Sequence, residues 1–486
     1  MDPILYWNEV VNEADRTTHT TLAASEARAQ GPCGSSRAYA IVHLAMHDAY
    51  FSIIPGKYNT YLEGLPAVPP DADADADAAD AAVAAAAHAT LSALYPTQKA
   101  FFDARHAAAG LVAGQAGVDG HVFGQAVAAA ILARREDDPG LSDDGYSSSV
   151  ARGHHRQDPD NAGQGFYAPF YGARSGCFAV TERHHLDAAP QLGTDEYNGA
   201  VAQVRNKGIA PQLMGTLQDN PLYPPRTPTE TLIGLFWAYD GAKGLGTPPR
   251  LYNQIIRTVA DAQGNDVAAN ARLFAVVNAA MGDAGILAWD DKYVYDVWRP
   301  VLGIREHDPS MGPTGVGGDV LTDDSDPGWL PLGAPKTNDP GKKNSTPKNS
   351  TPPFPAYPSG HATFGAAVFQ SVRRFYDKCE NGPDDLADGL EFASEELNGI
   401  SVDNTGAIRP RHVRRFSDGL WEMIEENGRS RVFLGVHWVF DAFAVDADGE
   451  IDLSQNVGGV SLGLAIADNI ATSGLTAATA AGPRLV

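Results

Sequence analysis

The sequence predicts an all-α protein built as two helical bundles. Apolar residues recur at the spacing of three to four that is typical of amphipathic helices, whereas the alternation typical of strands is scarce. Connectors rich in proline and glycine separate the helical segments. Hydrophobic residues make up 43% of the 486 residues, so the chain can fill a large core.

The expected helices can be placed in order along the chain. The segment 36–53 carries apolar residues at helical spacing, and the alanine-rich segment 81–95 follows the acidic run DADADADAAD. A connector over 211–230 is the predicted boundary between an N-terminal bundle, 1–210, and a C-terminal bundle, 211–486. The other expected helices are 120–136, 228–242, 250–261, 268–288, 360–377, 384–398, 411–427 and 430–445.

The composition restricts the partners of the chain. Aspartate and glutamate total 60 against 36 lysines and arginines, and the formal charge of -24 repels nucleic acid and anionic membranes. We find no apolar run long enough for a transmembrane helix and no signal peptide at the start of the sequence. Three widely spaced cysteines, Cys33, Cys177 and Cys379, form neither a disulfide framework nor a CxxC metal site. We therefore expect no nucleic-acid and no membrane partner.

Two cations lie in the segment WDDKYVYDVWRP. Lys292 and Arg299 are seven residues apart, about two helical turns, so the spacing predicts that both lie on one face of a helix. Pro300 disfavours helical geometry at Arg299 and predicts a helix end there. Taken alone, two such cations are more often part of a solvated stripe than of a binding site.

A second segment, FPAYPSGHATF, changes from proline-rich extended chain to a helix. Ser359 is in the position of an N-cap, and the backbone N–H groups of Gly360 and His361 then lie at the positive end of the helix. Glycine also lets a ligand approach the backbone closely. The pattern is compatible with an anion site, and equally with an ordinary cap beside an incidental histidine.

The third segment is SRVFLGVHWVFD. Arg431 and His437 are six residues apart and fall on different sides of a straight helix. They can converge only if the helix starts or bends between them, and Gly435 is the expected place. Asp441, four residues beyond His437, is predicted to orient the histidine ring.

The ordered set KxxxxxxRP, PSGH and SRxxxxxHxxxD resembles the signature of the vanadium-dependent haloperoxidases and the related acid phosphatases. The resemblance to the fungal-type vanadium chloroperoxidases goes further, through FPAYPSGHATFG, SRVFLGVHW, FWAYDG (236–241) and GTPPRLYNQI (246–255). Weaker matches over 43–53 and 164–172 extend it across most of the chain.

This resemblance implies two four-helix bundles joined by long loops, with one vanadate per chain in the C-terminal bundle. His437 would bond to vanadium, and His361 would act as acid and base near the apical oxygen. Asp240 would pair with Arg431, and Trp289 and Phe354 would form a halide pocket. The groups implied to bind the other oxygens are Lys292, Arg299, Arg431, the Ser359 hydroxyl and the Gly360 amide.

The implied activity is the oxidation of chloride and bromide by hydrogen peroxide, which halogenates small organic substrates. Lys292 would polarise the peroxide, and the metal acts as a Lewis acid. An acid phosphatase is the main alternative, with His437 as the nucleophile and His361 as the general acid. A non-enzymatic anion-binding protein is a weaker one. The long-range resemblance and Trp289 favour the peroxidase, and the family suggests a secreted or periplasmic protein.

The remaining histidines are expected to be structural. His43 and His47 lie four residues apart in an apolar helix without the glutamate of an HExxH motif, so both are predicted to be core residues. The pairs at 154–155 and 184–185 lie in polar, loop-like sequence and are predicted to be solvated.

Overall fold

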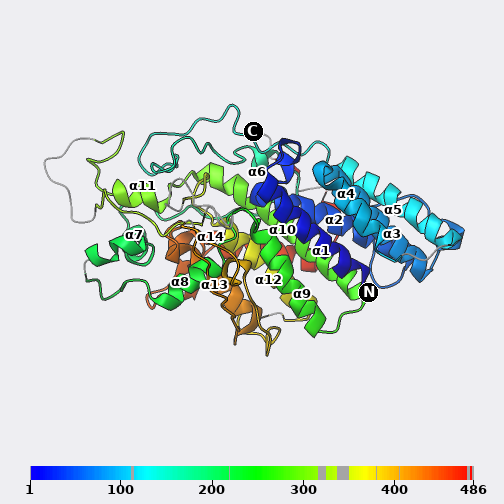
Figure 1. Cartoon of the computed structure of the whole chain (residues 1–486). Helices are drawn as coiled ribbons and strands as arrows, with labels where there is room; N and C mark the ends of the chain where they lie inside the picture. Colours follow the sequence, from blue (N-terminus) through cyan, green and yellow to red (C-terminus); the bar gives the residue numbers. More distant parts are fainter. Residues whose placement is uncertain are drawn as a thin grey trace.

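A computed structural model describes the protein over most of its length. The described residues form fourteen α-helices and one antiparallel pair of short strands, β1 (Ala444–Val445) and β2 (Ile451–Asp452) (Figure 1). The predicted all-α class is thus confirmed. The described residues are 2–110, 114–217, 219–315, 325–335, 350–378, 380–403, 405–478 and 482–483.

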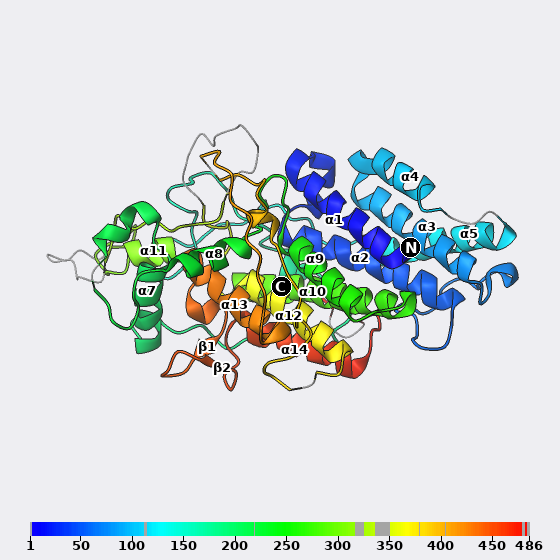
Figure 2. The same ribbon diagram turned by 60° about the horizontal axis from the view of Figure 1, so that its bottom comes forward.

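The first five helices gather at one end of the molecule (Figures 1 and 2). Helix α2 packs against α3 and α5, and α3 lies along α5. This group is α1 (Pro3–Thr21), α2 (Gly31–Ile53), α3 (Ala76–Leu94), α4 (Lys99–Ala107) and α5 (Gln115–Arg134), with the 3-10 segments η1 (Ala24–Ala29), η2 (Pro70–Ala72) and η3 (Pro96–Gln98).

Helix α10 (Val267–Tyr295) connects this group to the rest of the protein. It packs against α2 and also against α12 (Gly360–Phe375) and α14 (Gly458–Ser473), and most of its side chains are buried. The other elements are α6 (Tyr171–Arg174), α7 (Asp195–Lys207), η4 (Pro211–Thr216), α8 (Pro228–Phe236), α9 (Pro248–Ala262), α11 (Pro300–Arg305), η5 (Glu395–Leu397), α13 (Gly419–Phe433) and η6 (Val439–Asp441).

Helices α12 and α14 pack unusually closely behind the start of α12. A Cβ atom on Gly459 would lie 2.6 Å from the Ser359 carbonyl oxygen, which leaves no room for a side chain. The Ser359 N–H donates to the Asp441 carbonyl at 2.7 Å. The start of α12 is therefore held from two sides by segments that follow it in the chain.

Several parts of the sequence prediction were wrong. Helix α1 was not predicted, because buried polar residues such as Asn8 and Asp15 interrupt its apolar pattern. Helices α4, α6, α7, α11 and α14 were also missed. The predicted helix 384–398 contains only η5, since its glutamates form long-range ion pairs and Gly389 has a φ of 71°. The predicted helix 430–445 does not form, because α13 ends at Phe433.

The expectation about membrane-spanning segments also needs correction. Two described helices, α5 and α10, are long and apolar enough to cross a membrane by length and composition. In α10, 89% of the apolar stretch is buried inside the protein, as in a core helix. In α5, only 33% of the apolar stretch is buried. Core helices of soluble proteins pass the same test, so the absence of a membrane partner stays a prediction.

Two of the three cysteines lie among the described residues. Cys33 and Cys177 are buried and free, whereas Cys379 lies outside the described residues.

Candidate active site

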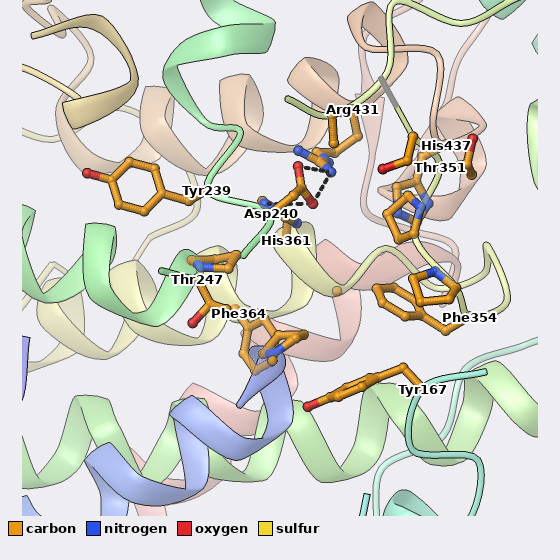
Figure 3. A pocket seen from close by; sticks show the side chains of 18 of the residues that line it. Tyr167, Tyr239, Asp240, Thr247, Thr351, Phe354, His361, Phe364, Arg431 and His437 are labelled. Carbon is orange, nitrogen blue, oxygen red and sulfur yellow. Dashed lines mark hydrogen bonds and ion pairs between the residues drawn. The ribbon is translucent and has the colours of Figure 1, made fainter. Parts of the chain in front are cut away.

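The three motif segments meet around one cavity of about 200 Å³ (Figure 3). Lys292 comes from the last turn of α10, and Ser359 caps α12. Arg431 comes from the end of α13, and His437 from the chain just after it. Each segment contributes to the lining of the cavity, through Trp289, Phe354, Gly360, His361, Arg431 and His437, and Asp240 joins them. Lys292, Arg299 and Ser359 are not among the lining residues.

His437 is held as a neutral imidazole whose Nε2 acts as an acceptor beside the Arg299 guanidinium. Gly435 adopts a φ of 73°, so the chain leaves α13 and turns His437 back toward Arg431, as the spacing required. The His437 Nδ1–H donates to Asp441 Oδ2 at 2.7 Å, which leaves Nε2 without a proton. Burial and the nearby Arg299 hold the pKa of His437 well below its usual value. Such a nitrogen is a typical metal ligand.

Arg299 does not share a helix with Lys292, contrary to the prediction of one helical face. Helix α10 ends at Tyr295, and Arg299 is the N-cap residue of α11 directly before Pro300. Its Nη1 donates to His437 Nε2 at 2.9 Å and to the Val436 carbonyl at 2.7 Å. Its Nη2 is buried and has no hydrogen-bond partner among the described residues.

Arg431 forms the expected pair with Asp240. Its Nη2 donates to both carboxylate oxygens, at 2.8 and 3.0 Å (Figure 3). Burial raises the pKa of Asp240, and Arg431 opposes that rise. The Nε and Nη1 groups of Arg431 are buried and find no acceptor in the part of the chain that the structure describes. The pair therefore leaves two N–H groups of the guanidinium available for a ligand.

Lys292 is bound to backbone rather than to an acidic side chain. Its ammonium donates to the carbonyls of Pro355 at 2.9 Å and Ala356 at 3.1 Å, and also to that of Pro358. Burial, reinforced by Arg299, holds the pKa of Lys292 well below its usual value. Lys292 thus organises the loop before Ser359. To bind an oxyanion, the ammonium must give up its hydrogen bond to one of these carbonyls.

The start of α12 has the predicted geometry. Ser359 is the N-cap, and its hydroxyl accepts the Ala362 N–H at 3.4 Å. A Cβ atom on Gly360 would lie only 3.1 Å from the Trp289 ring. His361 donates from Nε2 to the Ala238 carbonyl at 2.8 Å, because a carbonyl can only accept. Burial, with Arg431 nearby, holds its pKa well below the usual value.

Aromatic rings form the apolar wall of the cavity. The rings of Trp289 and Phe354 lie 4.8 Å apart, and Lys292 Nζ lies 5.1 Å from the Phe354 ring centre. Sequence reasoning missed the other members of the wall, Tyr167 and Phe364. Tyr167 lies in the segment 164–172, whose match to the family could have indicated a role in the site.

One histidine prediction was wrong. His155 was expected to be solvated, but its ring is buried, and neither ring nitrogen has a partner among the described residues. The reason is that its backbone N–H donates to the Asp296 carbonyl, which places the ring against Phe166. His43 is a buried core residue as predicted, and its Nε2 accepts from Asn8 at 2.9 Å.

Comparison with known proteins decides the family. Residues 1–165 match the family model of the vanadium chloroperoxidase N-terminal domain, and residues 272–459 match that of its second helical-bundle domain. The vanadium chloroperoxidase of Curvularia inaequalis is 37% identical, over 97% of this chain and 90% of its own length. The chain belongs to the vanadium chloroperoxidase family.

Solved structures of vanadium haloperoxidases share the fold. A bacterial vanadium-dependent iodoperoxidase is 15% identical with a TM-score of 0.56, covering 96% of each chain. An apo-type bacterial vanadium-dependent chloroperoxidase is 16% identical with a TM-score of 0.59, covering 91% of this chain and 93% of its own. At this identity the likeness concerns the fold alone. The two chloroperoxidase family models leave residues 166–271 unmatched, so the predicted boundary at 211–230 stays a prediction.

Proposed function

We propose that this chain binds one vanadate at His437 and uses hydrogen peroxide to oxidise chloride and bromide to hypohalous acid, which halogenates small organic substrates. The observation that carries the proposal is a set of buried, unpaired N–H groups beside a proton-free imidazole nitrogen. These are Arg299 Nη2 and the Nε and Nη1 groups of Arg431. The nitrogen is His437 Nε2.

The residues fit a tetrahedral oxyanion. Burying a charged donor without a partner is costly, so these guanidinium groups call for an anionic ligand. Arginine presents several N–H donors in a fixed fork, which suits the oxygens of such a ligand. The Ser359 hydroxyl and the Gly360 amide at the start of α12 would add further donors. His437 would supply the one protein–vanadium bond.

The chain's own residues supply orientation and proton transfer. Bound vanadate would contribute a Lewis acid that activates peroxide without a change of oxidation state. Asp441 holds His437, and Asp240 holds Arg431. Since the Nε2–H of His361 is committed to Ala238, Nδ1 is the nitrogen that takes a proton from incoming peroxide. Trp289 and Phe354, next to Lys292, would form the halide pocket.

Acid phosphatase activity is the rival function. The same cradle would bind phosphate, and His437 Nε2 would be the nucleophile. The test compares dye bromination, with vanadate and peroxide added, against p-nitrophenyl phosphate hydrolysis by the vanadate-free protein. We expect vanadate-dependent bromination that inorganic phosphate suppresses by competition. Phosphate-ester hydrolysis without any vanadate-dependent bromination would overturn the proposal.

Two further points are proposed from the resemblance and the sequence alone. We propose that the protein acts outside the cytoplasm, which fractionation of the native source would test. We also retain the domain division at residues 211–230, which limited proteolysis would test.

A further inference from the structure

The turn that carries Asp240 has a constrained backbone. Tyr239 has a φ of 36°, in the left-handed region that residues with a side chain seldom adopt. Its side chain is fully buried. Such a conformation persists only where the surroundings hold it in place.

The segment η5 holds Tyr239 at both ends. The Tyr239 N–H donates to Glu396 Oε1 at 3.1 Å. The Tyr239 hydroxyl accepts the Glu395 N–H at 3.1 Å and donates to Gln254 Oε1 at 3.1 Å. The backbone and the side chain of one residue are therefore fixed by two consecutive glutamates.

Buried arginines fix these glutamates in turn. Glu396 is fully buried, and its Oε2 lies 2.6 Å from Arg409 Nη2. The Arg409 Nε also donates to the Glu396 carbonyl at 2.7 Å. Glu395 receives both terminal nitrogens of Arg250, at 2.7 and 2.9 Å. The two glutamates that hold Tyr239 are thus tied to α9 through Arg250 and to the loop after η5 through Arg409.

Both neighbours of Tyr239 reach the active site directly. The Ala238 carbonyl accepts from His361 Nε2 at 2.8 Å. The Asp240 carboxylate holds Arg431, and its Oδ1 lies 3.9 Å from His361 Nε2 (Figure 3). A change in the Tyr239 backbone would move both groups together.

We propose that Glu396 is a positioning residue for the active site. It holds Tyr239 so that the Ala238 carbonyl keeps the proton of His361 on Nε2 and Asp240 keeps Arg431 aimed at the cavity. Its effect on turnover rests on the proposed function, whereas its effect on the His361 tautomer does not. Burial raises the pKa of Glu396 to about 7, so the amide variant also reproduces the uncharged form of this side chain.

The test compares Glu396→Gln and Glu396→Ala with Glu391→Gln. The control removes a glutamate from the same stretch of chain, where Glu391 forms an exposed ion pair with Arg415. The first readout is the His361 tautomer, from imidazole nitrogen NMR of the vanadate-free protein, with His361→Gln used for assignment. The second is the pH profile of bromide oxidation by the vanadate-loaded enzyme.

We expect Glu396→Ala to give a mixture of His361 tautomers, a shifted pH profile and a kcat lowered about 10- to 100-fold, the usual effect of losing an outer partner. Glu396→Gln should fold, since it keeps the shape and one acceptor, and should give smaller changes in the same direction. Glu391→Gln should match the parent protein. An unchanged tautomer and pH profile in both Glu396 variants would overturn the proposal. Altered tautomers in a protein with no peroxidase activity would support the positioning role while refuting the proposed function.

Discussion

The His437 ring and the Asp441 carboxylate lie 2.7 Å apart, joined through Nδ1 and Oδ2. The same Asp441 oxygen accepts the Trp438 N–H at 2.9 Å, so the carboxylate is fixed relative to the backbone that carries the histidine. Burial raises the pKa of Asp441 to about 7, opposed by Lys292 and Arg299. This relationship leaves Nε2 of His437 without a proton, and the proposed bond to vanadium would replace the hydrogen bond that Nε2 accepts from Arg299 Nη1.

Replacement of His437 should abolish vanadate binding, and replacement of Asp441 should weaken it. His437→Ala removes the proposed bond to vanadium, whereas Asp441→Asn removes only the group that orients the ring, at a cost of about 10- to 100-fold in affinity. Vanadate titration followed by ultrafiltration measures both. The control is His185→Ala, since His185 is paired with Asp291 and half exposed. Unchanged affinity in His437→Ala would refute the ligand assignment.

Replacement of His361 should separate binding from turnover. His361→Ala leaves the arginines and His437 in place, so vanadate should still bind. Turnover should fall by roughly 10²- to 10⁴-fold, because the variant lacks the proposed acid–base group. The kcat of fully loaded enzyme in a bromination assay checks this. Turnover close to that of the parent would show that His361 takes no part in proton transfer.

Removal of Asp240 should lower turnover, and the accompanying loss of stability should not account for the whole effect. Asp240→Ala frees Arg431 Nη2 and lets the guanidinium move, so we expect kcat to fall about 10- to 100-fold. The matched control is Asp384→Ala, which breaks another buried pair, with Arg373 at 2.9 Å, outside the cavity. Both variants should lose stability on denaturant unfolding, but only Asp240→Ala should lose turnover. Equal turnover in the two would assign Asp240 a purely structural role.

The aromatic wall of the cavity should determine which halides the enzyme oxidises. An aromatic ring at position 354 leaves His361 undisturbed and keeps the halide pocket apolar, so we expect chloride as well as bromide oxidation. Phe354→His should lower chloride oxidation relative to bromide by about tenfold, equivalent to roughly 1.4 kcal/mol in the barrier. Monochlorodimedone assays at about pH 5, just below the range in which histidine titrates, measure the ratio. An unchanged ratio would show that Phe354 does not discriminate between halides.

Acid should destabilise the protein through a histidine far from the active site. Burial lowers the pKa of His43 from 6.5 to about 4, and its Nε2 faces the Asn8 amide while Nδ1 faces the Tyr39 carbonyl. A depressed histidine pKa means that the unfolded chain binds the proton first. Stability is therefore constant above 6.5 and is lost as the pH falls toward 4.

The expected loss from His43 is about 2 kcal/mol at about pH 5, as an order of magnitude. Denaturant unfolding of the vanadate-free protein at pH 7 and pH 5 measures it. His43→Gln should flatten this pH dependence, whereas His154→Gln, at a half-exposed histidine, should not. Identical pH slopes in the parent and His43→Gln would contradict the assignment.

The helices that sequence reasoning placed best are those whose ends carry local signals. As predicted, Ser359 caps α12, Arg299 before Pro300 lies at a helix end, and the chain turns at Gly435. Helix α1 was not predicted, because its buried side chains include asparagines and an aspartate that form hydrogen bonds with other helices. Periodicity in one segment carries no information about those partners.

The sequence by itself determined the residue types of the site, the backbone breaks that turn them inward and, through the ordered motifs, the family. These are local properties, because a cap, a proline or a left-handed glycine acts within one turn of chain. Only the tertiary structure decided that Lys292 binds three carbonyls, that His155 is buried and that Glu396 holds Tyr239. Each of these depends on segments distant in the sequence that meet only when the helices pack.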